Sequence, residues 1–358
     1  MQSSLFNYHL PEERIAQEPA AARDASRLLV VHRQERRIEH RTFSDLPEYL
    51  GENDTLFRNN ARVLPARLFA QRPSGGAAEC LLLRPASNDG LEWWTLLRPG
   101  KRLNPGASFS REGYFSAEVV DKNEEKAEYR VRFSLQHHSS VPALAEDLGK
   151  MPLPPYISRE KSDQRDASDK ERYQTIYASG EKAVAAAAPT AGLHFTPEIV
   201  DTLTQKGARF HDLVLHVGMG TFKPLQTENI EDHEIHREIY EISENTQNAI
   251  RTPQGRRRVC VGTTSVRSVE DYLAKSDSIT PGQFTGEADI FIYPPRQFQG
   301  VDALITNFHQ PNSTLLCLVS SFLAPGKTDG IDWLKEIYAE AISLEYRFLS
   351  YGDAMLIL

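Results

Sequence analysis

The stretch "RVCVGTTSVRSVEDYLAKS", residues 258–276, is typical of a β-strand that leads directly into an α-helix. An apolar run comes first, a glycine and three hydroxyl residues follow, and a helix-like segment begins there. The same succession recurs through the second half of the chain. Alternation of this kind indicates an α/β layer structure, in which helices pack on a sheet.

The alternating region contains several further strand-like and helix-like runs. Strands are expected at 209–217, 258–264, 289–294 and 301–308, and helices at 196–207, 243–252, 265–276, 313–324 and 333–349. Nearer the N-terminus, a helix start is expected at 10–16 and a β-hairpin at 27–43.

Residues from about Thr55 to Gln136 have a different pattern of apolar and polar residues. Short apolar runs are separated by turn signals, and no helical period is visible. Trp93 and Trp94 alternate in the manner of core residues. This pattern predicts a small β-barrel or sandwich. The Pro-rich stretch "MPLPPYI", residues 151–157, then marks a linker into the α/β region.

Bulk composition limits the possible classes of protein. The chain has 358 residues, of which 40% are hydrophobic and 25% charged, as expected for a globular protein of two domains. Its net charge of −8 argues mildly against a nucleic-acid partner, although basic residues cluster locally. No signal peptide or membrane span is visible, and the three cysteines show no disulfide or zinc spacing. We therefore expect a cytoplasmic protein without a metal site.

Residues suited to binding or catalysis gather where the expected strands end, which is where open α/β sheets bind ligands. A hydroxyl run that opens a helix is suited to hold a carboxylate or phosphate, although an N-cap cluster is an equal alternative. The residues at these junctions are His194, His216, Gly218, Gly220, Thr263, Thr264, Ser265, Asn307 and His309.

Among the histidines, His194 is the first candidate for an acid or base. It lies in "PTAGLHF", a turn of small residues directly ahead of a helix that starts at Thr196. The positive end of that helix would lower the imidazole pKa and keep the ring neutral. A histidine that only stabilises the turn is the alternative. His233 and His236, three residues apart, suit one face of a helix, but no third metal ligand is evident.

The chain resembles the S-adenosylmethionine:tRNA ribosyltransferase-isomerases of queuosine biosynthesis. The resemblance covers essentially the whole chain and is carried by motifs in order. These include "RDASRLLVV", "ARVLPARLF", "LLRPGKRLNPG", "MPLPPYI", "RYQTIYA", "AAPTAGLHFT", "LHVGMGTFKPL", "HEIHRE", "GTTSVRSVE", "DIFIYPPRQF", "DALITNFHQPNSTLL" and "YRFLSYGDAMLI". It implies an α/β/α catalytic domain, residues 1–55 plus 151–358, with an inserted small β-barrel domain, residues 56–150.

The resemblance also implies a reaction. The ribosyl part of S-adenosylmethionine would move onto 7-aminomethyl-7-deazaguanine at the wobble position of tRNA, which yields epoxyqueuosine, adenine and methionine. S-adenosylmethionine is then a consumed substrate, and no cofactor is expected. The sulfonium acidifies the C5′ hydrogens, so a base must form an ylide-like carbanion, and protonation helps adenine to leave. A histidine near neutrality can serve either role.

The residues expected to carry these roles lie within the matching motifs. The candidates for catalysis are His194, His216, His233, His236 and His309. The candidates for substrate binding are Thr190, Gly192, Gly218, Gly220, Glu234, Thr263, Thr264, Ser265, Arg267, Asp289, Tyr293 and Asn307. Arg62, Arg67, Arg98, Lys101 and Arg102 are the candidates for tRNA binding.

Some positions depart from the family pattern. Asn60 and Ala61 stand where an Asp and a Thr are common, and Asn312 stands where a Lys is common. No catalytic role is therefore carried over to Asn60 and Ala61.

Three other functions compete with this interpretation. A Rossmann-type methyltransferase could use "HVGMG" as its glycine-rich loop, but the usual acidic residue on the next strand is missing. A non-catalytic RNA-binding protein could use the barrel alone, and a metal hydrolase could use His233 and His236. A monomer that binds tRNA and S-adenosylmethionine remains the expectation.

Overall fold

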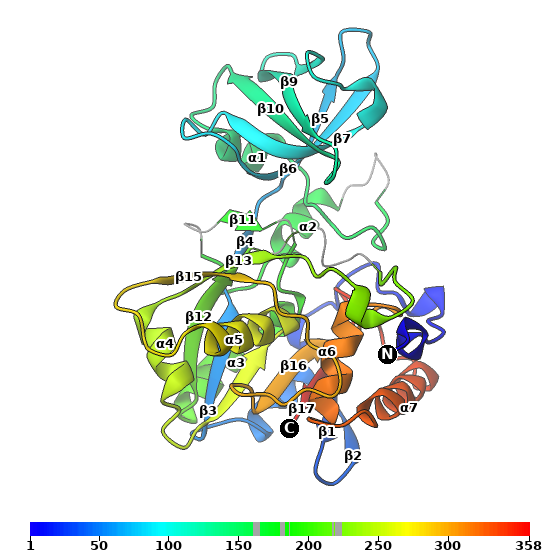
Figure 1. Ribbon diagram of the computed structural model, residues 1–358, viewed down its shortest axis with the longest axis vertical. Coiled ribbons are helices and arrows are strands. Elements are labelled where there is room, and N and C mark those ends of the chain that lie inside the picture. The colour runs from blue at the N-terminus through cyan, green and yellow to red at the C-terminus, as the bar shows by residue number, and fades with distance from the viewer. Residues whose placement is uncertain (160–164, 180–182, 186, 217, 219–223) are drawn as a thin grey trace.

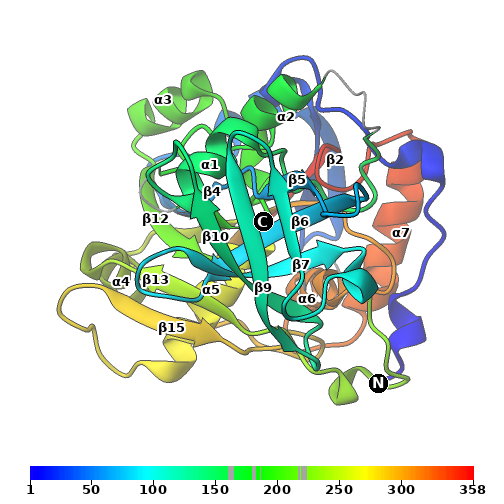
Figure 2. The same cartoon turned by 90° about the horizontal axis from the view of Figure 1, so that it is seen from above.

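The computed structural model describes residues 1–159, 165–179, 183–185, 187–216, 218 and 224–358. A large α/β unit carries a small β-barrel at one end, and the view from above places the barrel over the centre of the larger unit (Figures 1 and 2). The expected fold class, an α/β/α layer structure with a small barrel, is confirmed by this architecture.

Within the described residues, nine strands form the sheet of the larger unit. In order across the sheet they are β15 (Phe284–Ala288), β13 (Glu238–Ile242), β12 (Arg209–Leu215), β3 (Asp54–Asn59), β14 (Arg257–Val261), β16 (Ala303–Asn307), β17 (Ala354–Ile357), β1 (Arg27–His32) and β2 (Arg37–Thr42). The strands from β12 to β16 are parallel, so their carboxyl ends meet at one edge. The expected hairpin is β1 paired with β2.

Both faces of this sheet are buried, because apolar residues occupy successive positions along its strands. In β1, Leu28 and Val30 belong to one core, whereas Leu29 and Val31 belong to the core on the opposite face. Side chains of a strand alternate between faces, so a strand such as β1 supplies both cores. The result is a sheet enclosed between two helical layers.

The two layers contain different helices. The helices α4 (Glu244–Arg251), α5 (Thr263–Lys275), α6 (Thr314–Leu323) and α7 (Gly330–Ser343) contribute to one core. The other face is covered by α3 (Pro197–Gln205) and the 3-10 helix η4 (Phe43–Glu48). Among the described residues, no helix is long and apolar enough to cross a membrane.

The smaller unit is a closed antiparallel barrel (Figure 1). Its strands, in order around the barrel, are β10 (Glu128–Leu135), β7 (Glu92–Arg98), β6 (Ala77–Pro85), β5 (Arg67–Gln71), β8 (Ser108–Arg111) and β9 (Phe115–Asn123). Trp93 is buried in its core while Trp94 is only half-buried, which fits the expected alternation. The helix α1 (Val141–Leu148) completes this core.

The barrel is inserted between two segments of the larger unit. The strand β3 lies in the centre of the main sheet and runs to Asn59, so the expected boundary at 55/56 falls inside a strand. The barrel core begins with Leu64, and Leu148 packs against it. We propose that the inserted unit runs from Leu64 to Leu148. The returning chain is held by a pair of backbone hydrogen bonds between Arg67 and Lys150.

Three local expectations were wrong. Residues 10–16 contain only a short 3-10 turn, Glu12–Arg14, because Ile15 bridges to Phe348 in extended form. Residues 289–294 are not a strand; the strand there is β15, which ends at Ala288 where its partner β13 begins. The last long helix ends at Ser343 rather than 349, because Glu345 turns into the left-handed region with φ +61°.

Candidate functional site

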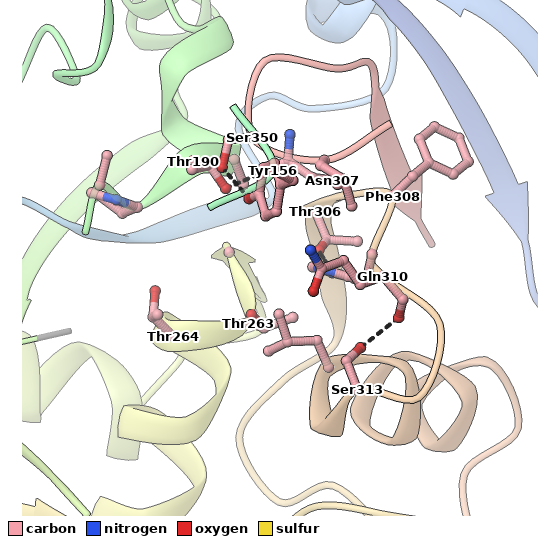
Figure 3. A pocket seen from close by; sticks show the side chains of 17 residues that line it. Tyr156, Thr190, Thr263, Thr264, Thr306, Asn307, Phe308, Gln310, Ser313 and Ser350 are labelled. Atoms are coloured by element: carbon pink, nitrogen blue, oxygen red, sulfur yellow. Dashed lines mark hydrogen bonds between the residues drawn. The ribbon is translucent and has the colours of Figure 1, made fainter. Parts of the chain in front are cut away.

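A cavity of about 680 Å³ lies at the carboxyl edge of the parallel strands. Figure 3 shows Thr190, Asn307, Tyr156 and Ser350 on one side of it, with Thr263 and Thr264 on the other. The residues that line it are Tyr156, Ala188, Pro189, Thr190, Ala191, Gly262, Thr263, Thr264, Thr306, Asn307, Phe308, His309, Gln310, Ser313, Leu315, Leu349 and Ser350. Its position, outside the carboxyl ends of parallel strands, is where α/β sheets usually bind ligands.

One wall of the cavity is the turn from β14 into α5. Gly262 has φ +89° and ψ 151°, a conformation that a residue with a Cβ rarely adopts, so the turn requires glycine. The first N–H groups of α5 have no acceptor within the helix and carry its positive end. The Thr264 hydroxyl is buried and makes no hydrogen bond to any of the described residues. A buried, unpaired donor beside a helix N-terminus is suited to an anionic ligand.

Only part of the expected hydroxyl cluster faces the cavity. Thr263 and Thr264 line it, but the Ser265 hydroxyl is fully buried and donates to the Val261 carbonyl at 2.8 Å. Arg267 lies one turn further along α5 and is bound to Glu238 in a buried ion pair. The structure therefore separates Ser265 and Arg267 from the anion cradle that the sequence suggested.

A chain of hydrogen bonds connects the cavity to His194. The Thr190 hydroxyl donates to Asn307 Oδ1 at 2.8 Å, and Asn307 Nδ2 lies 3.2 Å from His194 Nε2. His194 Nδ1 lies 2.9 Å from the Ser26 hydroxyl, which donates to the Arg23 carbonyl. The oxygen of the Asn307 amide accepts from Thr190, so its nitrogen is the donor that faces His194. His194 is therefore assigned to accept at Nε2 and to donate from Nδ1.

His194 is buried behind Asn307 and is not among the residues that line the cavity. Burial lowers its pKa to about 4, so the ring is neutral near pH 7, as the sequence suggested. The largest cause is desolvation of the imidazolium rather than the α3 N-terminus. Gly192, in the same turn, packs so closely that a Cβ would lie 2.0 Å from the Tyr177 hydroxyl oxygen.

His309 is the expected histidine that lines the cavity itself. Its Nε2 lies 2.8 Å from the Thr306 hydroxyl, and its backbone N–H donates to the Tyr338 hydroxyl at 3.0 Å. Burial lowers its pKa to about 3, so this imidazole is also neutral. The strand β16 thus ends with one candidate, Asn307, and the second candidate, His309, follows two residues later.

The remaining histidines lie elsewhere. His216 is half-buried at the end of β12, with Nε2 3.5 Å from Glu241. Gly218 donates its N–H to Glu238 at 3.2 Å, and Gly220 lies outside the described residues. The helix expected for His233 and His236 is absent from the described residues 230–237, since only the turn Ile230–Asp232 forms there.

His233 and His236 instead line a second cavity of about 450 Å³ together with Arg267. Across the part of the chain that the structure describes, no group of three or more His, Cys, Asp or Glu side chains is placed to hold a metal ion. Glu234 is exposed, and Asp289 is held by Lys275 at 2.6 Å. Tyr293 is half-buried, with its ring centroid 4.9 Å from that of Phe291.

Two residues of the first cavity, Tyr156 and Ser350, were not among the candidates. A hydrogen bond of 2.6 Å joins their hydroxyl groups. They lie almost 200 positions apart in the chain, one after the barrel and one before β17. Both lie in motifs that carry the family resemblance, "MPLPPYI" and "YRFLSYGDAMLI". Their place in these motifs was the signal in the sequence that could have identified them.

The candidates for tRNA binding fall into two groups. Arg62 and Arg67 form ion pairs with Glu146 and Glu79 at 3.0 and 2.6 Å. Arg98, Lys101 and Arg102 are exposed on the barrel around a 3-10 turn, Gly100–Arg102. The second group offers side chains that reach solvent within a short stretch of one surface.

The two buried imidazoles, of His194 and His309, predict how the free energy of unfolding depends on pH. Their folded-state pKa values, about 4 and about 3, lie below the ordinary value of 6.5, so the unfolded chain binds protons that the folded chain does not. The contribution of these two groups to the free energy of unfolding is therefore greatest above pH 6.5 and falls as the pH is lowered toward 4. Replacing His194 by Gln should flatten the pH dependence of the unfolding free energy by up to about 1.4 kcal/mol per pH unit.

Urea unfolding between pH 4 and 7 measures this slope. The exposed His137, changed to Gln, provides the matched control. An identical slope in wild-type protein and H194Q would contradict burial of a neutral His194.

Comparison with known proteins agrees with this architecture and with the resemblance. The family model described as queuosine biosynthesis protein matches residues 3–357. A protein of Symbiobacterium thermophilum named S-adenosylmethionine:tRNA ribosyltransferase-isomerase is 46% identical over 364 residues, and one of Thermotoga petrophila with the same name is 44% identical over 360, each covering 100% of both chains. The crystal structure of the S-adenosylmethionine tRNA ribosyltransferase from Thermotoga maritima is similar, with a TM-score of 0.54, 35% identity, and coverage of 99% and 100%. The chain therefore belongs to the queuosine biosynthesis family, the family of the S-adenosylmethionine:tRNA ribosyltransferase-isomerases.

Proposed function

We propose that this enzyme moves the ribosyl moiety of S-adenosylmethionine onto 7-aminomethyl-7-deazaguanine at the wobble position of tRNA and rearranges it to epoxyqueuosine. Adenine and methionine leave. Family membership supports the reaction, and one structural observation supports its location. The cavity at the carboxyl edge combines a helix N-terminus, a neutral imidazole and a hydroxyl pair within a single enclosure. We further propose that the protein acts as a cytoplasmic monomer without a resident cofactor.

The turn that begins α5 is suited to the methionine carboxylate of S-adenosylmethionine. The Gly262 N–H donates to the Ile305 carbonyl at 2.8 Å, so Thr263 and Thr264 are the residues that bring N–H groups without an acceptor inside the helix, and a hydroxyl donor, to one place. Because these groups are fixed by the strand and the helix, a bound carboxylate needs no rearrangement of the chain. The sulfonium then lies within the same cavity, near the residues that follow β16.

His309 is the proposed acceptor of the C5′ proton. Its Nε2 can donate to the Thr306 hydroxyl, which leaves Nδ1 as the basic nitrogen. Burial makes the free imidazole a weak base, but a bound carboxylate nearby favours the imidazolium and raises the pKa toward neutrality. The base would therefore become competent when the substrate is bound.

His194 has a different proposed role, because Asn307 separates it from the cavity. Its Nε2 accepts from the Asn307 amide, and this contact orients the amide toward Thr190 and the substrate. We therefore assign His194 to positioning, although it was the first candidate for the acid or base.

The reaction itself has a direct test. Purified protein is incubated with S-adenosylmethionine and tRNA that carries 7-aminomethyl-7-deazaguanine, and the nucleosides are analysed by mass spectrometry. Epoxyqueuosine and free adenine are expected. S-adenosylhomocysteine in place of adenine would instead identify a methyltransferase.

Two histidine variants separate the proposed roles. H309Q should lower turnover by about 10²–10⁴, because glutamine hydrogen-bonds but cannot accept the proton. H194Q should keep most of the turnover, since glutamine can accept from Asn307 and donate to Ser26. Single-turnover rates and the Kd of S-adenosylmethionine are measured for both variants. If H194Q loses turnover and H309Q retains it, the two assignments are exchanged.

The anion cradle predicts a binding defect. Replacing Thr264 by Val removes the unpaired hydroxyl at nearly constant volume, so S-adenosylmethionine should bind about 1–3 kcal/mol more weakly if that hydroxyl donates to the carboxylate. Titration calorimetry measures the change. Thr285→Val, at an exposed position of β15, is the control. Equal affinity of T264V and wild type would remove Thr264 from the site.

The exposed barrel residues predict a salt effect. Changing Lys101 and Arg102 to Gln should weaken tRNA binding and lower the slope of log K against log salt by about two units, one for each lost phosphate contact. Arg36 and Arg37, exposed in the β1–β2 turn far from the barrel, are the matched control pair (Figure 1). An unchanged slope in the Lys101 and Arg102 variant would show that this turn does not contact tRNA.

A further inference from the structure

We propose that the second cavity, lined by His233, Ile235, His236, Arg267, Ile290, Phe291, Ile292, Thr314, Leu315 and Leu318, is the subsite for the purine ring of S-adenosylmethionine. This inference rests on the proposed function and adds the place where the adenine part of the substrate is held.

The two cavities adjoin at the start of α6. Leu315 lines both of them, while Ser313 lines the first and Thr314 the second. The helix α5 makes the same connection, because Thr263 and Arg267 are four residues apart and therefore lie on one side of the helix. Thr263 lines the first cavity and Arg267 the second. A ligand with two chemically distinct halves can therefore contact both.

The walls of the second cavity suit a flat heterocycle. Ile290, Ile292 and Leu318 supply aliphatic surface, and the rings of Phe291 and His233 meet edge to face with centroids 5.6 Å apart. Aromatic and aliphatic walls around a few polar groups are the usual surroundings of a nucleobase-sized ligand. Burial lowers the pKa of His233, so its ring is neutral and can donate or accept a hydrogen bond.

Among the polar residues of the cavity is Arg267, whose side chain is buried, with the residue 8% exposed. Its terminal nitrogens are engaged: Nη1 binds Glu238, and Nη2 donates to the carbonyls of His236 and Ala288 at 3.0 Å each. Its Nε is buried and has no hydrogen-bond partner among the residues that the structure describes. A buried N–H that makes no hydrogen bond is unfavourable, so an acceptor supplied by a ligand would be favoured.

Adenine matches this donor better than the tRNA base does. Its ring nitrogens are neutral acceptors in the plane of a flat ring. The 7-aminomethyl-7-deazaguanine base has a carbon at position 7 and carries a cationic aminomethyl group, which would be placed against a guanidinium. The Arg267 Nε–H would also stabilise electron density on the ring as adenine leaves.

The test maps the purine directly. The 8-azidoadenine analogue of S-adenosylmethionine is bound to the full-length protein, irradiated, and the labelled peptides are identified by mass spectrometry. Label on residues 233–236 or 290–292 is expected. Label confined to residues 306–313 or 349–350 would place the purine in the first cavity and overturn the proposal.

A variant gives an independent measurement. Arg267 itself is a poor choice, because its loss would leave Glu238 buried without its ion-pair partner. Ile235→Trp fills the second cavity from a half-buried loop position and should weaken S-adenosylmethionine binding by about tenfold or more. Ile239→Trp, 52% exposed in β13 and outside the cavity, should bind normally. Unchanged affinity of a folded I235W would also overturn the proposal.

These outcomes are separate from a failure of the proposed function. If no epoxyqueuosine forms from the modified tRNA but the label maps to the second cavity, the purine subsite stands and the reaction assignment fails. If epoxyqueuosine forms and the label maps to the first cavity, the reaction stands and the subsite fails.

Discussion

The buried amide of Asn59 fixes the point at which the chain leaves the main sheet toward the barrel. It lies at the carboxyl end of the central strand β3, where its Oδ1 accepts from the backbone N–H groups of Ala61 and Leu215 at 3.0 and 3.1 Å, and its Nδ2 donates to the Leu215 carbonyl. A single side chain thus joins the ends of two parallel strands and directs the chain out of the sheet toward the barrel. Replacing these bonds by water is impossible at a position with no solvent exposure. The barrel consequently emerges at the same edge of the sheet as the candidate active site (Figure 1).

The helix α5 organises that edge. Its N-terminus forms one wall of the first cavity, and its next turn carries Arg267 into the second. The positive φ of Gly262 allows β14 to pass into α5 without an intervening loop, so the spacing between the two cavities is set by the pitch of one helix. A site built on a strand and a helix holds its groups more rigidly than a site built on long loops.

Buried neutral histidines are the second feature of the site. An imidazolium enclosed without a counter-charge is strongly disfavoured, so His194 and His309 remain neutral and take defined places as donor and acceptor. The chain from Thr190 through Asn307 and His194 to Ser26 then has one consistent direction of donation. Such a chain orients the Asn307 amide, which faces the cavity. His309 is then the imidazole that can contact the substrate.

The fold class and the β-barrel could be predicted from the amino-acid sequence, because apolar periodicity and turn residues are local properties of the chain, and the family was recognised from its motifs. The sequence also identified Thr264, Asn307 and His309, since strand ends in an α/β sheet are recognisable from the pattern that precedes them. Which of the candidates share a cavity depends on how distant segments pack in three dimensions. Arg267 and His194 are close in sequence to cavity residues, yet one is turned into a second cavity and the other is shielded by an amide. Tyr156 follows the barrel in the chain and Ser350 precedes β17, and no local pattern encodes a contact between residues so distant in the chain.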